Sequence, residues 1–438
     1  MAEPTRIEAK LSAFDAAMVV VSLVIGIGIF RTPAIVAAAA GSSGRFLAAW
    51  AVGGLISLVG AFTFAEIGSR RPRAGGYYKV VADCYHPALA FMLNWAQALM
   101  QGAGAAGVAF IGAEYLLPLI VRGHRSPSLT LATACALMMA LLFANWLGVR
   151  SGSRTQNLLS IAKIAMIAGL AILALALAPR APDAAPAAPP STFLAALIPC
   201  FYAYGGYQMT MNLGADVKDA RRKLPLAITA GMAIVVGLYL GINVAYQRAL
   251  GTSGIAGSKL VAAALSRVTF GPVGEAVISL LIFLSAAGFV NATVLQMPRT
   301  FYAMAEDGVL PRGFLRVNER TQVQELGLLF FGVTMLVPAF LLGSFEKLLS
   351  YVMFTDALTF VVVASTLFVL RRRGGAADDV FRMPGYPVLP ALFVLCLFGV
   401  AVHICVTETR LALAGALVFA TGLPLFLAGR RLWGARPS

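Results

Sequence analysis

The chain has 438 residues, of which 59% are hydrophobic and 12% are charged, and its mean hydropathy is +0.83. This composition excludes an ordinary soluble domain and is typical of a protein that crosses a membrane many times. The formal net charge of +15 would suit nucleic-acid binding, but the positions of the basic residues give it another cause, and no nucleic-acid partner is expected.

Apolar segments recur along the whole chain after an N-terminal tail at 1–15, which has no apolar core and therefore no cleavable signal peptide. They predict an all-α integral membrane protein with twelve transmembrane helices. The predicted spans are 16–40, 46–69, 88–120, 128–148, 156–178, 193–214, 224–249, 272–303, 327–343, 347–370, 386–408 and 411–429.

The basic residues are distributed unevenly between the two sets of loops. Twelve spans place both termini on one side, and if that side is cytoplasmic it holds 23 of the 34 lysines and arginines, against nine on the outer side. The positive-inside rule therefore predicts cytoplasmic termini for a multi-pass protein of the cytoplasmic (inner) membrane. Orientation in the membrane also explains the basic composition.

The first span is interrupted near its middle by Gly26, Ile27 and Gly28, and Pro33 is the expected start of the second half-helix. Backbone groups that such a break frees are costly in lipid unless protein, water or a ligand satisfies them. The break therefore predicts a cavity, although small residues also suit close packing against a neighbouring helix.

A loop at 179–192, rich in proline and alanine, divides the chain after the fifth span, and the sixth span carries a second break within YAYGGY. The first span of each five-helix half is thus interrupted, which indicates an inverted-repeat transporter with its site between the broken helices. The predicted units are a first repeat at 16–178, a second at 193–370, a cytoplasmic loop at 371–385 and a final helix pair with the C-terminus at 386–438.

The two breaks together predict a site for a zwitterion such as an amino acid. The N–H groups at the first break would bind a carboxylate at the positive end of a helix dipole, and the freed carbonyls of both breaks would bind an ammonium. Water or neighbouring side chains are the alternative partners. The predicted substrate-binding residues are Val24, Ile25, Gly26, Ile27, Gly28, Tyr202, Ala203, Tyr204 and Gly205.

Lys163 lies inside the fifth span, where a lysine costs about 3 kcal/mol on insertion scales. We expect it to face a cavity or a partner, as a fixed or titrating cation that replaces a sodium ion and couples transport to protons. Snorkelling toward the cytoplasmic interface is the alternative. Asp356, in the middle of the tenth span, has either a substrate or proton role or a structural hydrogen bond.

Several uncharged polar residues are candidates for the pathway. Asn94, Gln97 and Gln101 share one face of the third span, where lining the pathway and hydrogen bonding between helices both remain open. The same two alternatives apply to Asn291 in the eighth span, and Gln208 beside the second break is a further pathway candidate.

Tyr202 lies at the second break and is expected to act as a gate, with core packing as the alternative for it and for its neighbour Tyr207. Glu114 suits an interfacial position, whereas Arg31 either faces an outer vestibule or pairs with an acid. The five cysteines and three histidines show no metal-ligand spacing, and the chain has no HExxH or GxSxG motif, so no cofactor, metal or enzyme activity is expected.

Four motifs make the chain similar to the amino acid–polyamine–organocation (APC) superfamily, most closely to its branch of L-type amino acid transporters and related bacterial permeases. They are GIGIF at 26–30, AEIGSRRPRAGGYYKV at 65–80, FYAYGGYQ at 201–208 and RTFYAMAEDGVLP at 299–311. The resemblance implies the leucine-transporter-type fold, a five-plus-five inverted repeat with helices 1 and 6 broken and two further helices.

The resemblance also implies roles for individual residues. The backbone at Gly26, Ile27 and Gly28 would hold the carboxylate of an amino acid, Tyr202 would be the gate, and Lys163 would take the place of a sodium site. The chain departs from the family at Ile27, where many relatives have a small residue, and at Tyr207, where tryptophan is common. Residues 121–128 contain no cysteine, so no disulfide-linked heavy subunit is expected.

We therefore expect a sodium-independent secondary transporter of amino acids, chiefly neutral L-amino acids, that works by alternating access as a proton symporter or as an exchanger. An amine or polyamine carrier of the same fold is the alternative, although a polycation would need more acids than Asp356, the one obvious carboxylate within the spans. A membrane-embedded sensor or enzyme fits less well, because no loop is long enough for an output domain.

Overall fold

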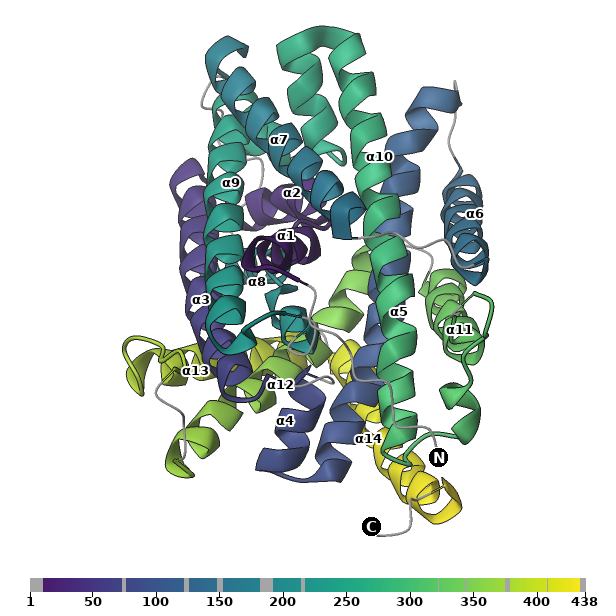
Figure 1. Cartoon of the computed structure of the whole chain (residues 1–438). Helices are drawn as coiled ribbons and strands as arrows, with labels where there is room; N and C mark the ends of the chain where they lie inside the picture. The colour runs from purple at the N-terminus through teal and green to yellow at the C-terminus, as the bar shows by residue number, and fades with distance from the viewer. Residues whose placement is uncertain are drawn as a thin grey trace.

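The computed structural model describes residues 11–72, 76–121, 126–147, 153–181, 192–213, 217–321, 323–342, 345–374, 379–407 and 409–433. These residues form helices joined by turns, with one isolated β-bridge between Leu11 and Val217 (Figure 1). The helices are α1 (Ala13–Val24), α2 (Gly28–Ala40), α3 (Ser43–Arg70), α4 (Gly76–Cys84), α5 (Pro87–Ile120), α6 (Pro127–Trp146), α7 (Ser153–Leu177), α8 (Phe193–Ala203), η1 (Tyr207–Leu213), α9 (Ala220–Ala256), α10 (Val261–Glu306), η2 (Arg312–Leu315), α11 (Glu325–Leu342), α12 (Phe345–Arg372), α13 (Val388–Thr407) and α14 (Thr409–Trp433).

Within these ranges, eight helices are long and apolar enough to cross a membrane, and the bent pair of α1 and α2 adds a ninth candidate. The eight are α3, α5, α6, α7, α9, α10, α13 and α14, while α11 is a shorter apolar helix and α12 occupies the predicted tenth span. Their outer faces carry exposed apolar side chains such as Leu341 and Val406, which suit contact with lipid. The chain is therefore an all-helical membrane protein.

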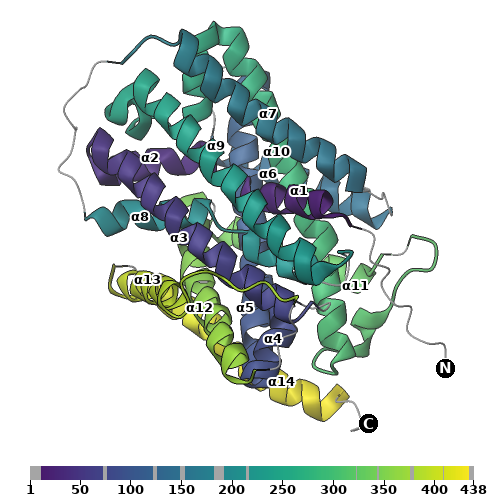
Figure 2. The same cartoon turned by 60° about the vertical axis from the view of Figure 1, so that its left-hand side comes forward.

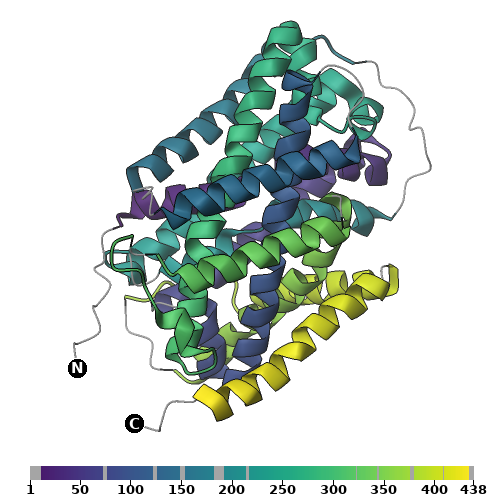
Figure 3. The same cartoon turned by 90° about the vertical axis from the view of Figure 1, so that its right-hand side faces the viewer.

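Helix α5 lies at the centre of the bundle and packs against α4, α6, α10, α11, α12 and α14 (Figures 1 and 3). Its middle is a run of small buried residues between Gly102 and Ala109, which lets neighbouring backbones come close. A Cβ atom on Gly102 would lie only 2.4 Å from the Thr334 carbonyl oxygen in α11. The small residues of α5 thus determine how closely α11 packs.

Segments that the distribution of lysines and arginines places on the same side of the membrane lie close together in the structure. At one end, the buried Glu66 carboxylate at the end of α3 accepts from Arg371 at the end of α12 at 2.6 Å, and Lys79 of α4 pairs with Asp307 after α10. At the other end, Arg31 of α2 donates to the Lys259 carbonyl at 2.8 Å. These contacts fit the predicted topology, which stays a prediction together with the inverted repeat.

The structure shifts several predicted boundaries. Helix α2 begins at Gly28 and not at Pro33, because the Phe30 N–H donates to Ile27 O at 2.9 Å and restarts the helix at once. Pro33 is tolerated inside α2. The short helix α4 was not predicted, and α10 begins ahead of the expected eighth span and kinks at Gly271. Figure 2 shows α1, α2 and α8 crossing the long helices in the middle of the molecule.

Candidate binding site at the two helix breaks

The two breaks predicted from the sequence lie against each other. Helices α1 and α2 are bent by 45° about the non-helical residues Ile25, Gly26 and Ile27, and α8 ends at Ala203 before a turn leads into η1. Helix α2 packs on α8 so tightly that a Cβ atom on Gly28 would lie 3.2 Å from Ala203 Cα. The ends of four short helical segments therefore meet at one place.

Gly206 makes the closest approach between the breaks. Its φ of 116° is a conformation that side chains rarely adopt, and a Cβ atom there would lie 2.5 Å from the Leu23 carbonyl oxygen at the end of α1. Only glycine meets both conditions. From the sequence, Gly205 of this glycine pair was predicted to bind substrate, whereas Gly206 was not.

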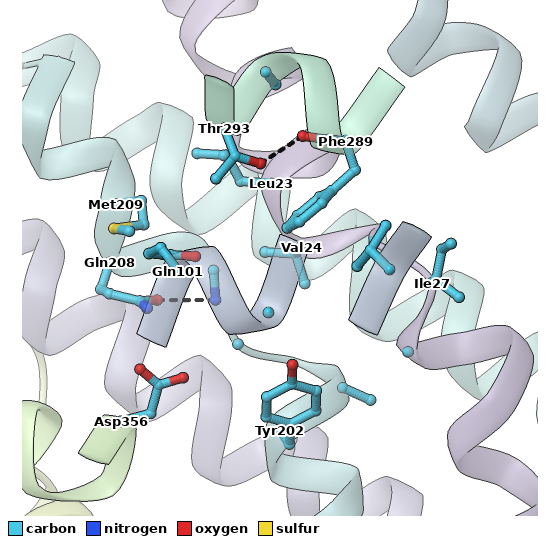
Figure 4. A pocket seen from close by; sticks show the side chains of 18 of the residues that line it. Leu23, Val24, Ile27, Gln101, Tyr202, Gln208, Met209, Phe289, Thr293 and Asp356 are labelled. Carbon is cyan, nitrogen blue, oxygen red and sulfur yellow. Dashed lines mark hydrogen bonds between the residues drawn. The ribbon is translucent and has the colours of Figure 1, made fainter. Parts of the chain in front are cut away.

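A cavity of about 100 Å³ lies between the breaks (Figure 4). This volume is below the roughly 300–1,000 Å³ of sites for drug-sized ligands and favours a small ligand. Most of the predicted binding residues line it, but Ile25 and Tyr204 do not. The lining residues are Leu23, Val24, Gly26, Ile27, Gly28, Gln101, Gly104, Val108, Tyr202, Ala203, Gly205, Gly206, Gln208, Met209, Phe289, Ala292, Thr293, Gln296 and Asp356.

Two carbonyls at the first break already have hydrogen-bond partners. Val24 O accepts from the Tyr239 hydroxyl at 3.0 Å and from Gly26 N–H at 2.7 Å, and Ile25 O accepts from Lys163 Nζ at 3.1 Å. In the described part of the chain, the N–H groups of Ile27 and Gly28 have no backbone acceptor. The first break thus offers donors to the cavity, and side chains satisfy the acceptors that the sequence assigned to an ammonium.

Tyr239 was not predicted to belong to the site, and its role can be tested. Replacing Tyr239 by phenylalanine removes one donor from Val24 O and should lower the free energy of unfolding by about 1 kcal/mol. Tyr246 provides the matched control on the same helix, because its buried hydroxyl has no partner among the described residues. Thermal denaturation in detergent should show a lower melting temperature for Tyr239→Phe and no loss for Tyr246→Phe. Equal effects would contradict the assignment.

Lys163 lies behind the first break and not in the cavity. It is buried on α7, which packs against α1, and its ammonium group donates to Ile25 O. Of the two expected surroundings, a cavity or a partner, Lys163 has a partner, which is a freed carbonyl of the break itself. The hydrogen bond therefore connects α7 to the break between α1 and α2.

Asp356 of α12 lines the cavity from the side opposite Phe289 (Figure 4). Its Oδ1 accepts from Gln97 Nε2 of α5 at 3.1 Å. Gln208 also lines the cavity, and its Oε1 accepts from Gly206 N–H at 2.9 Å, which fixes the amide beside the second break. Asp356 and Gln208 are thus placed where a bound molecule could reach them.

The remaining pathway candidates separate into two groups. Asn94 lines a smaller pocket next to the cavity, together with Gln97, and donates to Ala90 O at 3.0 Å within its own helix. Asn291 lies outside the cavity and accepts from Asn145 of α6 at 2.7 Å, which is a hydrogen bond between helices. The spacing of polar residues along a helix could not show which of them lines a pocket and which bonds a neighbouring helix.

The three tyrosines of the second break also have different surroundings. Tyr202 approaches the cavity, and Figure 4 shows Phe289 on the opposite side. Tyr204 is buried and donates to Trp50 O of α3 at 3.2 Å. Tyr207 is buried against the rings of Phe64 and Phe360. Of these three tyrosines, only Tyr202 therefore lines the cavity.

Arg31 and Glu114 form an ion pair of 3.7 Å between α2 and α5, so the acid-pairing alternative for Arg31 holds. Phe289, Thr293 and Gln296 bring α10 into the cavity wall. Neither Phe289 nor Gln296 was predicted from the sequence, although Gln296 is a polar residue within an apolar span. Half of the cysteine-free loop at 121–128, residues 122–125, lies outside the described residues.

Comparison with known proteins gives consistent results along the whole chain. A family model described as amino acid permease matches residues 11–424. The chain is 27% identical over 430 residues to the serine/threonine exchanger SteT of Bacillus subtilis (strain 168), covering 97% of both chains. It is 26% identical over 450 residues to the human cystine/glutamate transporter, covering 99% of this chain and 88% of that one. It is 25% identical over 451 residues to the human Asc-type amino acid transporter 1, covering 99% and 84%.

Proposed function

The chain belongs to the amino acid permease family, and from this premise we propose that it is a sodium-independent secondary transporter of amino acids, chiefly neutral L-amino acids. The relatives named above are transporters, so the chain is a membrane transport protein and not an enzyme. The mechanism would be alternating access, as exchange or as proton symport. The protein would lie in the cytoplasmic membrane with both termini inside, as the basic loops suggest.

One observation carries this proposal: both helix breaks line the same small cavity. The substrate carboxylate would bind the N–H groups of Ile27 and Gly28, which point from the first turn of α2 at the positive end of its dipole. The ammonium would bind at the end of α8, where Tyr202 and Ala203 line the cavity. An amino acid would then satisfy donors and acceptors that lipid cannot.

The proposed conformational change uses the same elements. Tyr202 would close over the bound amino acid as a gate, and the two broken helices would rotate with their repeats about the site. This requires the leucine-transporter-type arrangement, with twelve spans in a five-plus-five inverted repeat and two additional helices. Lys163 would hold Ile25 O in place of a sodium ion, which accounts for sodium independence.

Transport in proteoliposomes tests the proposal directly. Vesicles that contain the purified chain and are preloaded with unlabelled serine should take up labelled serine equally well when choline replaces sodium outside. The remaining proteinogenic amino acids, tested as competitors, would define the range of substrates. Failure of every amino acid to bind or move would overturn the assignment, and a strict requirement for sodium would overturn the role given to Lys163.

An amine or polyamine carrier is supported less well. A polycation needs several acceptors of negative charge, and among the residues that line the cavity Asp356 is the one with a charged side chain. Adding spermidine and putrescine to the same competition assay separates the two functions. The proposal predicts that neither displaces serine.

A further inference from the structure

Asp356 belongs to the walls of three neighbouring pockets. It lines the central cavity together with both breaks, and it also lines a pocket with Tyr77 and Phe360 and another with Phe201 and Tyr202. The two smaller pockets have volumes of about 10 and 20 Å³. A ligand bound at the breaks can therefore extend a short side chain toward Asp356.

Two side-chain oxygen atoms at Asp356 and Gln97 accept no hydrogen bond from the described residues. The Oδ1 atom of Asp356 accepts from Gln97 Nε2, and its Oδ2 has no hydrogen-bond partner among the described residues. The Gln97 side chain is 5% exposed, and its Oε1 is buried without a hydrogen-bond partner among the residues that the structure describes. Such buried acceptors are costly unless a donor reaches them.

The charges of the site are also unbalanced. An α-amino acid bound by its carboxylate and ammonium brings no net charge, so an ionised Asp356 carboxylate has no counter-ion among the residues that line the cavity. Lys163 cannot serve, because its ammonium bonds Ile25 O behind the break. The aromatic rings of Tyr77, Tyr202 and Phe360 beside Asp356 have negative faces that favour a cation. A positively charged group therefore completes this region in both charge and hydrogen bonding.

We propose that Asp356 and Gln97 form a subsite for the side-chain ammonium of a short cationic amino acid, which makes such amino acids a second substrate class of this transporter. The inference rests on the proposed function, since it assumes an amino acid held by its backbone at the two breaks. In the loaded state, Asp356 Oδ2 and Gln97 Oε1 accept from the side-chain ammonium, and the zwitterionic end occupies the same position as in serine.

Pairs of amino acids that match in size and differ in charge test this subsite. Binding to the purified full-length chain would be measured by calorimetry for 2,4-diaminobutyrate against norvaline, and for ornithine against norleucine. At least one cationic member should bind about tenfold more tightly than its neutral partner. Asp356→Asn keeps the side-chain shape and should abolish this preference, so that the cationic and neutral members of each pair bind equally.

Asp83→Asn is the matched control, because it removes an exposed carboxylate of α4 outside the cavity and should keep the preference. Equal binding within both pairs in the unmodified chain would overturn the subsite, whatever the variant does, and so would a preference that survives in Asp356→Asn. Serine binding with no cationic preference would leave the proposed function standing. Binding of no amino acid at all would instead refute the proposed function.

Discussion

Replacing Gly206 by alanine should destabilise the protein and abolish amino acid binding. The added Cβ atom would lie 2.5 Å from the Leu23 carbonyl oxygen, which belongs to the backbone and cannot rotate away. A φ of 116° adds conformational strain of about 1–3 kcal/mol for a residue other than glycine. The clash and the strain both lie between α1 and the second break. They can be relieved only if the two breaks move apart, and this would change the shape of the cavity between them.

Thermal denaturation and calorimetric titration with serine would measure the two effects of Gly206→Ala. We expect a clearly lower melting temperature and no detectable serine binding. Gly169→Ala on α7 is the matched control, because a Cβ atom there meets nothing within 4 Å, and alanine favours a helix by about 1 kcal/mol. The control should be at least as stable as the unmodified chain. Unaltered serine binding in Gly206→Ala would show that the close approach of the breaks is not needed for the site.

The helices and both breaks could be predicted because their signals are local. Hydropathy over about twenty residues locates the spans, and two glycines separated by one residue reveal the first break. The break is displaced by one residue, to Ile25–Ile27, because Gly28 already has the conformation of a first helical residue. The second break was also found, but its continuation as the 3₁₀ helix η1 was not.

The hydrogen-bond partners at the breaks could not be predicted, because they come from distant parts of the chain. Tyr239 bonds Val24 O across 215 residues, and Lys163 bonds Ile25 O across 138 residues. A pattern within α1 identifies the free carbonyls but not the side chains that reach them. The sequence therefore assigned these carbonyls to a ligand, whereas in this structure the protein satisfies them itself.

The same limit applies to polar residues within the spans. Asn291 and Asp356 look alike in sequence, as single polar residues in apolar helices, yet one bonds Asn145 between helices and the other lines the cavity. Which residue faces the site depends on how α10 and α12 rotate against α5, and packing sets that rotation. The proposal for Asp356 therefore needed the structure.

Replacing Lys163 by methionine should slow exchange by about tenfold or more, because it keeps the volume of the side chain and removes the cation that holds Ile25 O. A buried carbonyl that loses its donor costs about 1–3 kcal/mol, and the cost falls on the hinge between α1 and α2. If the hinge moves between the outward and inward states, the free-energy cost of the unpaired Ile25 carbonyl differs between them. The substitution should therefore change the rate of transport more than the stability of either state.

Transport by Lys163→Met at several pH values separates a coupling role from a structural one. If Lys163 couples protons to transport, transport by the unmodified chain should depend on pH, and both Lys163→Met and Lys163→Ala should lose that dependence. Ser160→Ala is the control, because Ser160 lies one turn away on α7 and bonds Met18 O of α1 at 3.0 Å without carrying a charge. It should keep the pH profile of the unmodified chain. If both lysine variants keep the pH dependence of the transport rate, Lys163 has only a structural role at the break. Proton coupling would then depend on other residues.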